Sequence, residues 1–295
     1  CSSDLEINLV SDTAFYFLTF NSNVPHKRFT NQANNLTNPP LKEAYFLDKV
    51  KFNFRSEYVA GRSALEGQST SPVYYTLNSS QYEEEGYVKK TTTASDSITF
   101  TCTDPYLVSG DPFGEFKTTI VGKSFLNTHG MKISVKGTVI ADSTYGSFNL
   151  KRFTIGVPMS NVSAQNKITF KYTPYLTQGS LLDRFGIAYA EFKYPRNFNF
   201  GNKSSFYFEL GPKLTDYYLE INNFNTGNVS PRLYDLSTEQ YLIGDISTPG
   251  LVRFVIPATS SPKKLILQSI GTLNFGNVLN LQPVTFKNYS QVANQ

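Results

Sequence analysis

The sequence predicts a protein built almost entirely from β-strands, and three observations support this prediction. Aromatic residues are numerous, with 24 Phe and 19 Tyr but no Trp, and both types favour the pleated, half-buried surface of a sheet. The polar residues lean towards Asn, Ser and Thr, which suit turns and solvent-facing strand positions better than helix interiors. Short segments of alternating apolar and polar residues also follow one another, with turn residues at the spacing of about 8–12 residues that is typical of sandwiches.

The first expected strand, residues 14–20 (AFYFLTF), is apolar on both faces. A strand that packs only one face on a core alternates apolar and polar residues, so a strand without this alternation has to be covered on both sides. We therefore expect residues 14–20 to form a central strand between one sheet and another element. Residues 31–43 and 65–72 are rich in turn-forming residues and are expected to be exposed loops.

The segments that follow alternate more clearly. Within residues 49–61, the stretch 50–55 alternates strictly, with Val50, Phe52 and Phe54 on one face. In residues 96–104, Phe100 and Cys102 share one face while threonines occupy the other. A short helical turn is expected only at residues 180–186 (SLLDRFG). The strand pattern continues at 132–142, 153–158, 167–175, 186–195, 204–210, 216–224, 251–258 and 263–270.

Turn-rich segments divide the chain into three expected parts. Residues 1–210 are expected to form an antiparallel jelly-roll-like β-sandwich, because strand candidates fill this region. GPKLTD at 211–216 marks a shift to a smaller set of strands, so residues 211–272 are expected to form a small immunoglobulin-like β-sandwich. Residues 273–295 lose the alternation and are expected to be a connector.

Composition argues against several classes of function. The net charge is +4 and is spread evenly, so nucleic acid is not an expected partner. No apolar run reaches 18 residues, so no segment is expected to span a bilayer as a helix. The sequence has neither a glycine-rich phosphate loop after a strand nor a nucleophile elbow, and no cofactor is expected.

Few residues could support catalysis. The histidines are His26 and His129, and the cysteines are Cys1 and Cys102. A Cys102–His129 dyad is formally possible, but Cys102 is expected on the buried face of a strand, where burial raises the pKa of a thiol and makes it inert. We therefore expect Cys102 to be a packing residue, His26 to be solvated in a charged turn, and no residue of this chain to be catalytic.

Two further features leave alternatives open. Cys1 and Cys102 could form a disulfide, remain separate thiols or occur by accident. Cys1 followed by two serines also resembles the lipid-bearing first residue of a mature bacterial lipoprotein, and the simpler alternative is that position 1 is only where this chain starts. The acidic run Glu83–Glu85 could help to hold calcium, but three successive carboxylates on a strand cannot all face one ion, so we expect a solvated turn and no metal site.

Six segments occur in an order that is found in one protein family. They are SDTAFYFLTFN with KRF (11–29), SSQYEEEGYVKK (79–90), LLDRFGIAYAEFKYPRNF (181–198), PRLYDLS (231–237), FVIPA with KKLIL (254–267) and VTFKNYSQVANQ (284–295). Together they resemble the non-catalytic region that precedes the peptidase domain in type IX secretion system sortases, the gingipain-type cysteine peptidases of Bacteroidetes. Phe20 and Tyr87 stand where the family has Trp, and Glu84 where it has Gly, so the chain resembles a divergent member.

The resemblance implies that this chain is not itself an enzyme, because the Cys–His dyad of such a sortase lies in a peptidase domain that comes after residue 295. The parent protein would cleave C-terminal secretion signals and attach cargo to lipopolysaccharide at the outer-membrane surface of the bacterial cell. This chain would be a scaffold, and the implied partners are an outer-membrane β-barrel shuttle protein, the secreted cargo and the parent's own peptidase domain. The alternative is a free-standing cell-surface β-sandwich that binds glycans or another surface protein, because exposed Tyr and Phe can stack on sugar rings.

Overall fold

The structure is a computed structural model that describes residues 28–59, 86–108, 113–124, 128–146, 149–178 and 181–271, together with Asn274. These residues form strands and a short 3₁₀ helix (Met159–Asn161), and they contain no α-helix. The prediction of an all-β protein is therefore confirmed. No helix in this described part has the length and the apolar character needed to cross a membrane. The strand expected at 14–20, the loop expected at 65–72 and most of the connector expected at 273–295 lie outside the described residues.

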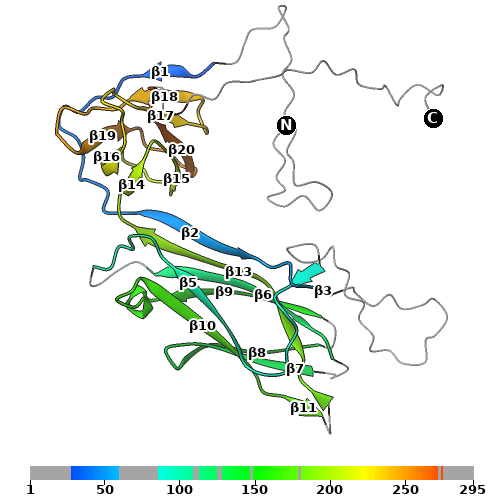
Figure 1. Cartoon of the computed structure of the whole chain (residues 1–295). Coiled ribbons are helices and arrows are strands. Elements are labelled where there is room, and N and C mark those ends of the chain that lie inside the picture. The colour runs from blue at the N-terminus through cyan, green and yellow to red at the C-terminus, as the bar shows by residue number, and fades with distance from the viewer. Residues whose placement is uncertain are drawn as a thin grey trace, which may run out of the picture.

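Figure 1 shows two bodies of strands that are connected by two long antiparallel strands. The strand β13 (Phe185–Arg196) runs from the larger body towards the smaller one, and β2 (Phe46–Asn53) runs in the opposite direction. In the larger body, the strands β2, β13, β6 and β9 form one sheet and β5, β10, β7 and β8 form the other. Neighbouring strands within both sets are antiparallel. Their bounds are β5 (Asp96–Thr101), β6 (Gly114–Gly122), β7 (Thr128–Val135), β8 (Thr138–Gly146), β9 (Leu150–Val157) and β10 (Lys167–Pro174).

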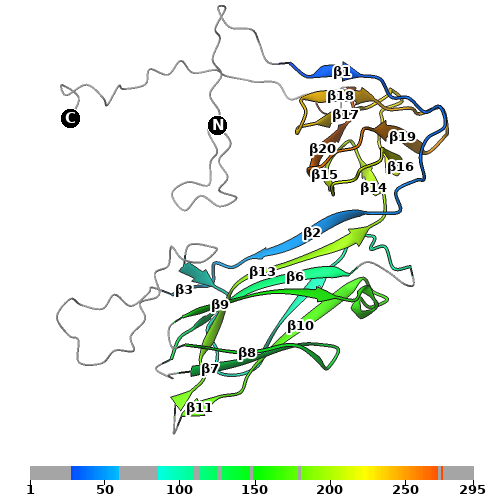
Figure 2. The same ribbon diagram turned by 180° about the vertical axis from the view of Figure 1, so that it is seen from behind.

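The smaller body extends the first of these sheets. Its strands follow the order β1-β18-β17-β20-β15, and β15 joins β2 through the pair Glu209 and Leu47, so that one sheet of nine strands runs through both bodies. The strands β14, β16 and β19 form the opposite sheet. Figure 2 shows the same arrangement from behind, with β1 and β18 at the far end of the smaller body. The bounds are β1 (Thr30–Gln32), β14 (Asn199–Lys203), β15 (Ser205–Leu210), β16 (Tyr217–Phe224), β17 (Arg232–Asp235), β18 (Gln240–Ile243), β19 (Leu251–Ile256) and β20 (Lys263–Gln268), beside the short pairs β3 (Glu57–Tyr58) with β4 (Tyr87–Val88) and β11 (Thr177–Gln178) with β12 (Leu181–Leu182).

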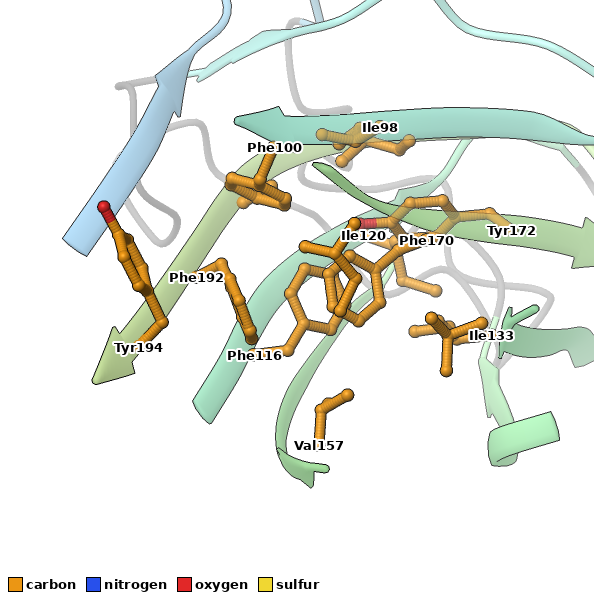
Figure 3. Packing of buried hydrophobic residues seen from close by; sticks show 14 of the residues in the cluster. Ile98, Phe100, Phe116, Ile120, Ile133, Val157, Phe170, Tyr172, Phe192 and Tyr194 are labelled. Atoms are coloured by element: carbon orange, nitrogen blue, oxygen red, sulfur yellow. The ribbon is translucent and has the colours of Figure 1, made fainter. Parts of the chain in front are cut away.

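An aromatic core fills the space between the two sheets of the larger sandwich (Figure 3). Phe116 of β6 and Phe170 of β10 stack with their ring centroids 3.7 Å apart. Phe100 of β5 packs edge-on against Phe116 at 6.0 Å and against Phe170 at 5.8 Å. The alternation read in residues 96–104 therefore places the inward residues correctly, and Cys102, which follows β5, is 1% exposed.

A second core fills the smaller sandwich, and it begins before the predicted boundary at residue 210. The buried residues of the first core end at Tyr194, whereas Phe198, Phe200 and the inward residues of β15 belong to the second. Phe46, at the start of β2, also packs in the second core. The domain limits at residues 210 and 272 stay predictions, but the two cores divide between Tyr194 and Phe198.

Two local expectations were wrong. Residues 132–142, read as one continuous strand pattern, form parts of β7 and β8. Lys136 and Gly137 lie between these strands with φ angles of 46° and 85°, the positive values that a two-residue type I′ hairpin turn requires. The helical turn expected at 180–186 is also absent from the described residues of that segment, since Leu181–Leu182 pairs with Thr177–Gln178 as an extended strand. The structure also contains the strand β6, which the sequence analysis did not predict.

The segment 31–43, expected to be an exposed loop, begins within β1 and is anchored across the smaller sandwich. The Asn34 side-chain amide donates hydrogen bonds to the carbonyl oxygens of Ile243 (2.9 Å) and Arg253 (3.0 Å). The backbone N–H of Val255 donates to Asn34 Oδ1 at 2.9 Å. Because Ile243 ends β18 and the other two residues lie in β19, one asparagine side chain ties the two sheets together.

Candidate functional site

Cys102, the one candidate nucleophile that the structure describes, is enclosed by the core. Its side chain packs in the same apolar cluster as Phe100, and its backbone N–H donates to the carbonyl oxygen of Asn166 at 2.8 Å. Burial, together with the nearby charge of Asp48, raises the pKa of the thiol to about 12. The thiolate, which is the nucleophilic form, is therefore strongly disfavoured at neutral pH.

We expect Cys102 to resist thiol reagents in the folded protein. In a Cys1→Ser background, Ellman's reagent at pH 8 should release no more than a trace of chromophore within minutes, because the thiol is both buried and protonated. One equivalent should be released promptly after unfolding in guanidinium chloride, which serves as the control. Rapid reaction of the folded protein would contradict the burial of this side chain.

His129 is the second candidate, and it forms a buried pair with Asp183. His129 is 0% exposed and Asp183 is 3% exposed. Nδ1 of the imidazole is hydrogen-bonded to Asp183 Oδ1, and the backbone N–H of Gly130 donates to Asp183 Oδ2 at 2.9 Å. The ring of Tyr145 stacks on the imidazole with centroids 4.9 Å apart. Burial and the Asp183 charge hold the pKa of the Tyr145 hydroxyl well above its ordinary value.

The geometry of this pair is similar to part of a hydrolytic triad, but the imidazole is not accessible to a substrate. A carboxylate on Nδ1 is the arrangement that orients a general base, which then acts through Nε2. Here Nε2 is buried, has no hydrogen-bond partner among the described residues, and lies against Gly122 of β6. A Cβ added at Gly122 would come within 2.6 Å of Nε2. The pair therefore links the two sheets from inside.

Replacing Gly122 by alanine is expected to lower the free energy of unfolding by about 1–3 kcal/mol, since the new methyl group overlaps the imidazole in a core with no room to yield. Urea denaturation followed by far-UV circular dichroism would measure the loss. Gly211→Ala is the matched control, because a Cβ at Gly211 meets no atom within 4 Å, and it should change stability by no more than about 0.5 kcal/mol. Equal effects for the two variants would contradict the close contact at His129.

The structure does not bring Cys102 and His129 together. Cys102 is hydrogen-bonded to Asn166, just before β10, whereas Gly130, next to His129, accepts a hydrogen bond from Tyr175, just after it. Asn166 and Tyr175 are nine positions apart, which at about 3.3 Å per residue of strand places Cys102 and His129 roughly 30 Å apart. The formally possible dyad is therefore not formed by these two residues.

Three of the other candidates from the sequence lie outside the described residues, namely Cys1, His26 and Glu83–Glu85. Cys102 is a free, buried thiol in the structure, whereas a lipid-bearing Cys1 and a calcium ligand at Glu83–Glu85 stay predictions. Within the described part of the chain, no group of three His, Cys, Asp or Glu residues is arranged to hold a metal ion.

A buried arginine marks the place where the two cores meet. Arg196, at the end of β13, is 6% exposed, and its Nη1 donates to Asp48 Oδ2 at 2.7 Å. The guanidinium also lies over the rings of Phe46 (5.8 Å) and Phe206 (5.0 Å) of the second core. A buried cation that is paired with a carboxylate and stacked on aromatic rings stabilises the fold more than an exposed cation does. Arg196 thus fastens the end of the first sandwich to the start of the second.

A second buried ion pair lies in the smaller sandwich. Lys263 Nζ and Asp235 Oδ2 are 2.6 Å apart, and their side chains are only 4% and 3% exposed. Burial alone would raise the pKa of Asp235, but the hydrogen bonds from Lys263 and from the backbone N–H of Ser237 hold it below its ordinary value. The Asp235 carboxylate is therefore charged in the folded protein at neutral pH.

Sequence reasoning missed these buried charged residues, although the strand alternation contained a signal for them. Lys263 is in phase with the inward Leu265, and Asp235 is in phase with the inward Leu233. A charged residue at an inward position requires a partner. Their inward positions could have identified Lys263 and Asp235 as buried charges. The two residues are 28 positions apart, however, and alternation within one strand does not tell which strand supplies the partner.

Comparisons with known proteins support the fold. No protein-family model matches the chain, and neither does any curated protein sequence. The crystal structure of dimeric latent PorU from Porphyromonas gingivalis matches with a TM-score of 0.55 and 10% sequence identity, over 83% of this chain. The match covers 22% of the PorU chain, so this protein corresponds to about one fifth of that length.

Two carbohydrate-binding modules also match in part. They are the CBM36-1 domain of a multidomain xylanase from the hindgut metagenome of Trinervitermes trinervoides (12% identity, TM-score 0.27) and a CBM36 module in complex with calcium and xylotriose (10% identity, TM-score 0.26). Each match covers 49% of this chain, and 96% and 98% of the respective module. TM-scores this low carry no argument about the present chain. What the comparisons show is that this chain has a β-sandwich fold similar to that of a region of PorU.

Proposed function

We propose that this chain is the non-catalytic scaffold and partner-binding portion of a cell-surface cysteine peptidase similar to the type IX secretion sortases. The observation that carries the proposal is the fold similarity to PorU over 83% of the chain, in a sequence whose six ordered segments resemble that family.

The residues within the similar segments have supporting roles in the structure, which favours a scaffold. Asp183, in the segment 181–198, holds His129 between the sheets, and Arg196, in the same segment, joins the two cores. Asp235, in the segment 231–237, forms the buried pair with Lys263 of the following segment. Side chains that fix the relative positions of sheets give a rigid frame on which a partner can be held in one orientation.

The proposal assigns peptide cleavage to a different part of the parent protein. In the described part of this chain, the Cys102 thiol is buried and lies far from His129. The parent would act at the bacterial cell surface, in association with the outer membrane, on the C-terminal secretion signals of cargo that it attaches to lipopolysaccharide. The proposed partners of this chain are the parent's peptidase domain, an outer-membrane β-barrel shuttle protein and the cargo.

Two experiments test the proposal. Incubated with peptides that carry a cargo secretion signal, the chain should cleave no bond in a manner that depends on Cys102, and cleavage that disappears in Cys102→Ala would overturn the proposal. The gene should also encode a caspase-like peptidase segment after Gln295, and that segment should bind this chain in isothermal titration calorimetry. A reading frame that ends soon after residue 295 would favour the alternative of a free-standing surface module.

A further inference from the structure

The outward face of the smaller sandwich carries a line of aromatic and aliphatic side chains. Tyr207 of β15 lies opposite Ile266 of β20, which lies opposite Tyr234 of β17, which lies opposite Tyr241 of β18. Residues that lie opposite one another on adjacent strands share a face of the sheet. We call these four side chains the tyrosine row.

The tyrosine row is not part of either core. The residues next to it along each strand, Phe206, Leu267, Leu233 and Leu242, point inwards and are buried. Tyr207 is 47% exposed, Phe29 beside the row is 39% exposed, and the other members of the row are half-buried. Large apolar side chains that gather on an outward face mark a site of interaction more often than a chance arrangement.

The same protein builds an ordinary polar face elsewhere, so composition alone does not explain the row. On the outward face of β5 and β10, Thr99 and Thr169 lie opposite each other with their Oγ1 atoms 2.8 Å apart. Lys171 and Ser97 form the adjacent pair on that face. Since one outward face is polar and the other aromatic, the aromatic residues of the row are a feature of that surface.

The rings of the row are held in place before any ligand arrives. Phe29 packs edge-on against Tyr234 with centroids 5.2 Å apart, and Tyr234 and Tyr241 are 6.0 Å apart. The guanidinium of Arg232 lies 4.9 Å from the centre of the Tyr241 ring. The Tyr207 hydroxyl donates a hydrogen bond to Glu209 Oε1. A surface whose side chains are already ordered loses less conformational entropy when it binds.

Hydrogen-bonding side chains border the rings, and their charges nearly balance. On the same outward face, Gln268 lies opposite Arg232, and Lys264 lies opposite Glu209. Two cations and one carboxylate give little net field, unlike the cationic surfaces that bind phosphate backbones. The chemistry of the surface is thus a set of fixed rings with neutral and weakly charged hydrogen-bonding groups at their edges.

We propose that the tyrosine row binds a neutral glycan chain that lies across the strands. Sugar rings present C–H groups that pack on aromatic faces, and their hydroxyls can bond to the polar groups at the border of the row. Tyr207 and Tyr234 are two strands apart, about 10 Å, a length that a disaccharide unit of an extended chain also spans. The row lies on an open sheet, whereas the energetic centre of a protein interface is usually a desolvated pocket.

This inference goes beyond the proposed function and does not depend on it. The test is affinity gel electrophoresis and isothermal titration calorimetry of the full chain with xylan, mannan, laminarin and hydroxyethylcellulose, with dextran sulfate as a charged comparison. At least one uncharged polysaccharide should bind. The affinity should change little between 50 and 200 mM NaCl, because few ions are released on binding.

The variants Tyr207→Ser and Tyr234→Ser should each weaken that binding by about tenfold or more, a loss on the scale of one aromatic stacking contact. The double variant Thr99→Ala/Thr169→Ala, on the polar face, is the matched control and should bind as the unaltered chain does. Thermal unfolding of each variant confirms that it is folded. If Tyr207→Ser does not fold, Tyr207→Leu removes the ring with a smaller loss of apolar surface and should weaken binding in the same way.

Three results would overturn the glycan assignment. They are the absence of binding to every uncharged polysaccharide, binding that the ring variants leave unchanged, and self-association of the chain that is lost in Tyr207→Ser without any glycan binding. The last result would identify the row as a protein interface. None of these results bears on the peptidase test, so the two proposals can fail separately.

Discussion

Replacing Lys263 by methionine is expected to lower the free energy of unfolding by about 3–5 kcal/mol, because it leaves the Asp235 carboxylate buried without its cation. The methionine has a similar volume, so the loss reflects the uncompensated charge and not a cavity. The measurement is urea denaturation at pH 7 followed by far-UV circular dichroism. Asp235 would retain its bonds from the Ser237 N–H at 2.9 Å and from the Thr238 side chain, and these uncharged donors do not replace an ammonium group.

The neighbouring lysine provides a matched control. Lys264 precedes Leu265 on the outward face and is exposed, so Lys264→Met should change the free energy of unfolding by no more than about 0.5 kcal/mol. The double variant Lys263→Met/Asp235→Leu should recover most of the loss, because an apolar pair can replace a buried ion pair at little cost. A double variant as unstable as Lys263→Met alone would show that the loss does not come from an unpaired charge on Asp235.

The same ion pair predicts the direction of a pH effect. Because the pKa of Asp235 is lower in the folded protein than in the unfolded chain, its contribution to stability is fully present above the unfolded value of about 4 and is lost as the pH falls through the folded value. Unfolding midpoints measured from pH 7 down to pH 2 should therefore decline less steeply in Asp235→Asn than in the unaltered chain. Parallel curves would show that Asp235 carries no such shift.

Truncation of Phe116 to alanine is the second large effect, with an expected loss of about 3–5 kcal/mol in the free energy of unfolding. Phe116 is 0% exposed, stacks on Phe170 from the opposite sheet and contacts the edge of Phe100 (Figure 3). Removing its ring leaves a cavity between the two sheets that rigid strands on both sides cannot fill. Differential scanning calorimetry and urea denaturation would measure the loss.

Phe113, three residues earlier, is the control for Phe116. It is 63% exposed, so Phe113→Ala should shift the free energy of unfolding by no more than about 0.5 kcal/mol. If both variants lost similar amounts, the assignment of Phe116 to the centre of the core would be wrong.

Strand periodicity accounts for most of what the sequence predicted correctly. The inward residues of β5, β15 and β20 follow from alternation alone, because a strand with one buried face repeats every two residues. Periodicity failed where a turn depends on backbone angles. The hairpin at Lys136 and Gly137 interrupts a pattern that still alternates across it.

Long-range partners were the other failure. The His129–Asp183 pair joins residues that are 54 positions apart, and Arg196 reaches Asp48 across 148 positions. The alternation within a strand predicts whether a side chain points inwards. Its partner depends on the order of strands in the sheet, and a short segment of sequence does not contain that order. The tyrosine row shows the same limit, since its members come from strands spread from residue 207 to residue 266.

The nine-stranded sheet has a consequence for the order of events during synthesis. Thr30 of β1 pairs with Gln240 of β18, and Phe46 completes a core that otherwise consists of residues from 198 onwards. A ribosome must therefore make some 200 further residues after β1 before its partner strand exists, and the larger sandwich can form in that interval. Closing so large a loop is slow, and the early segment is exposed to chaperones and proteases until β18 emerges.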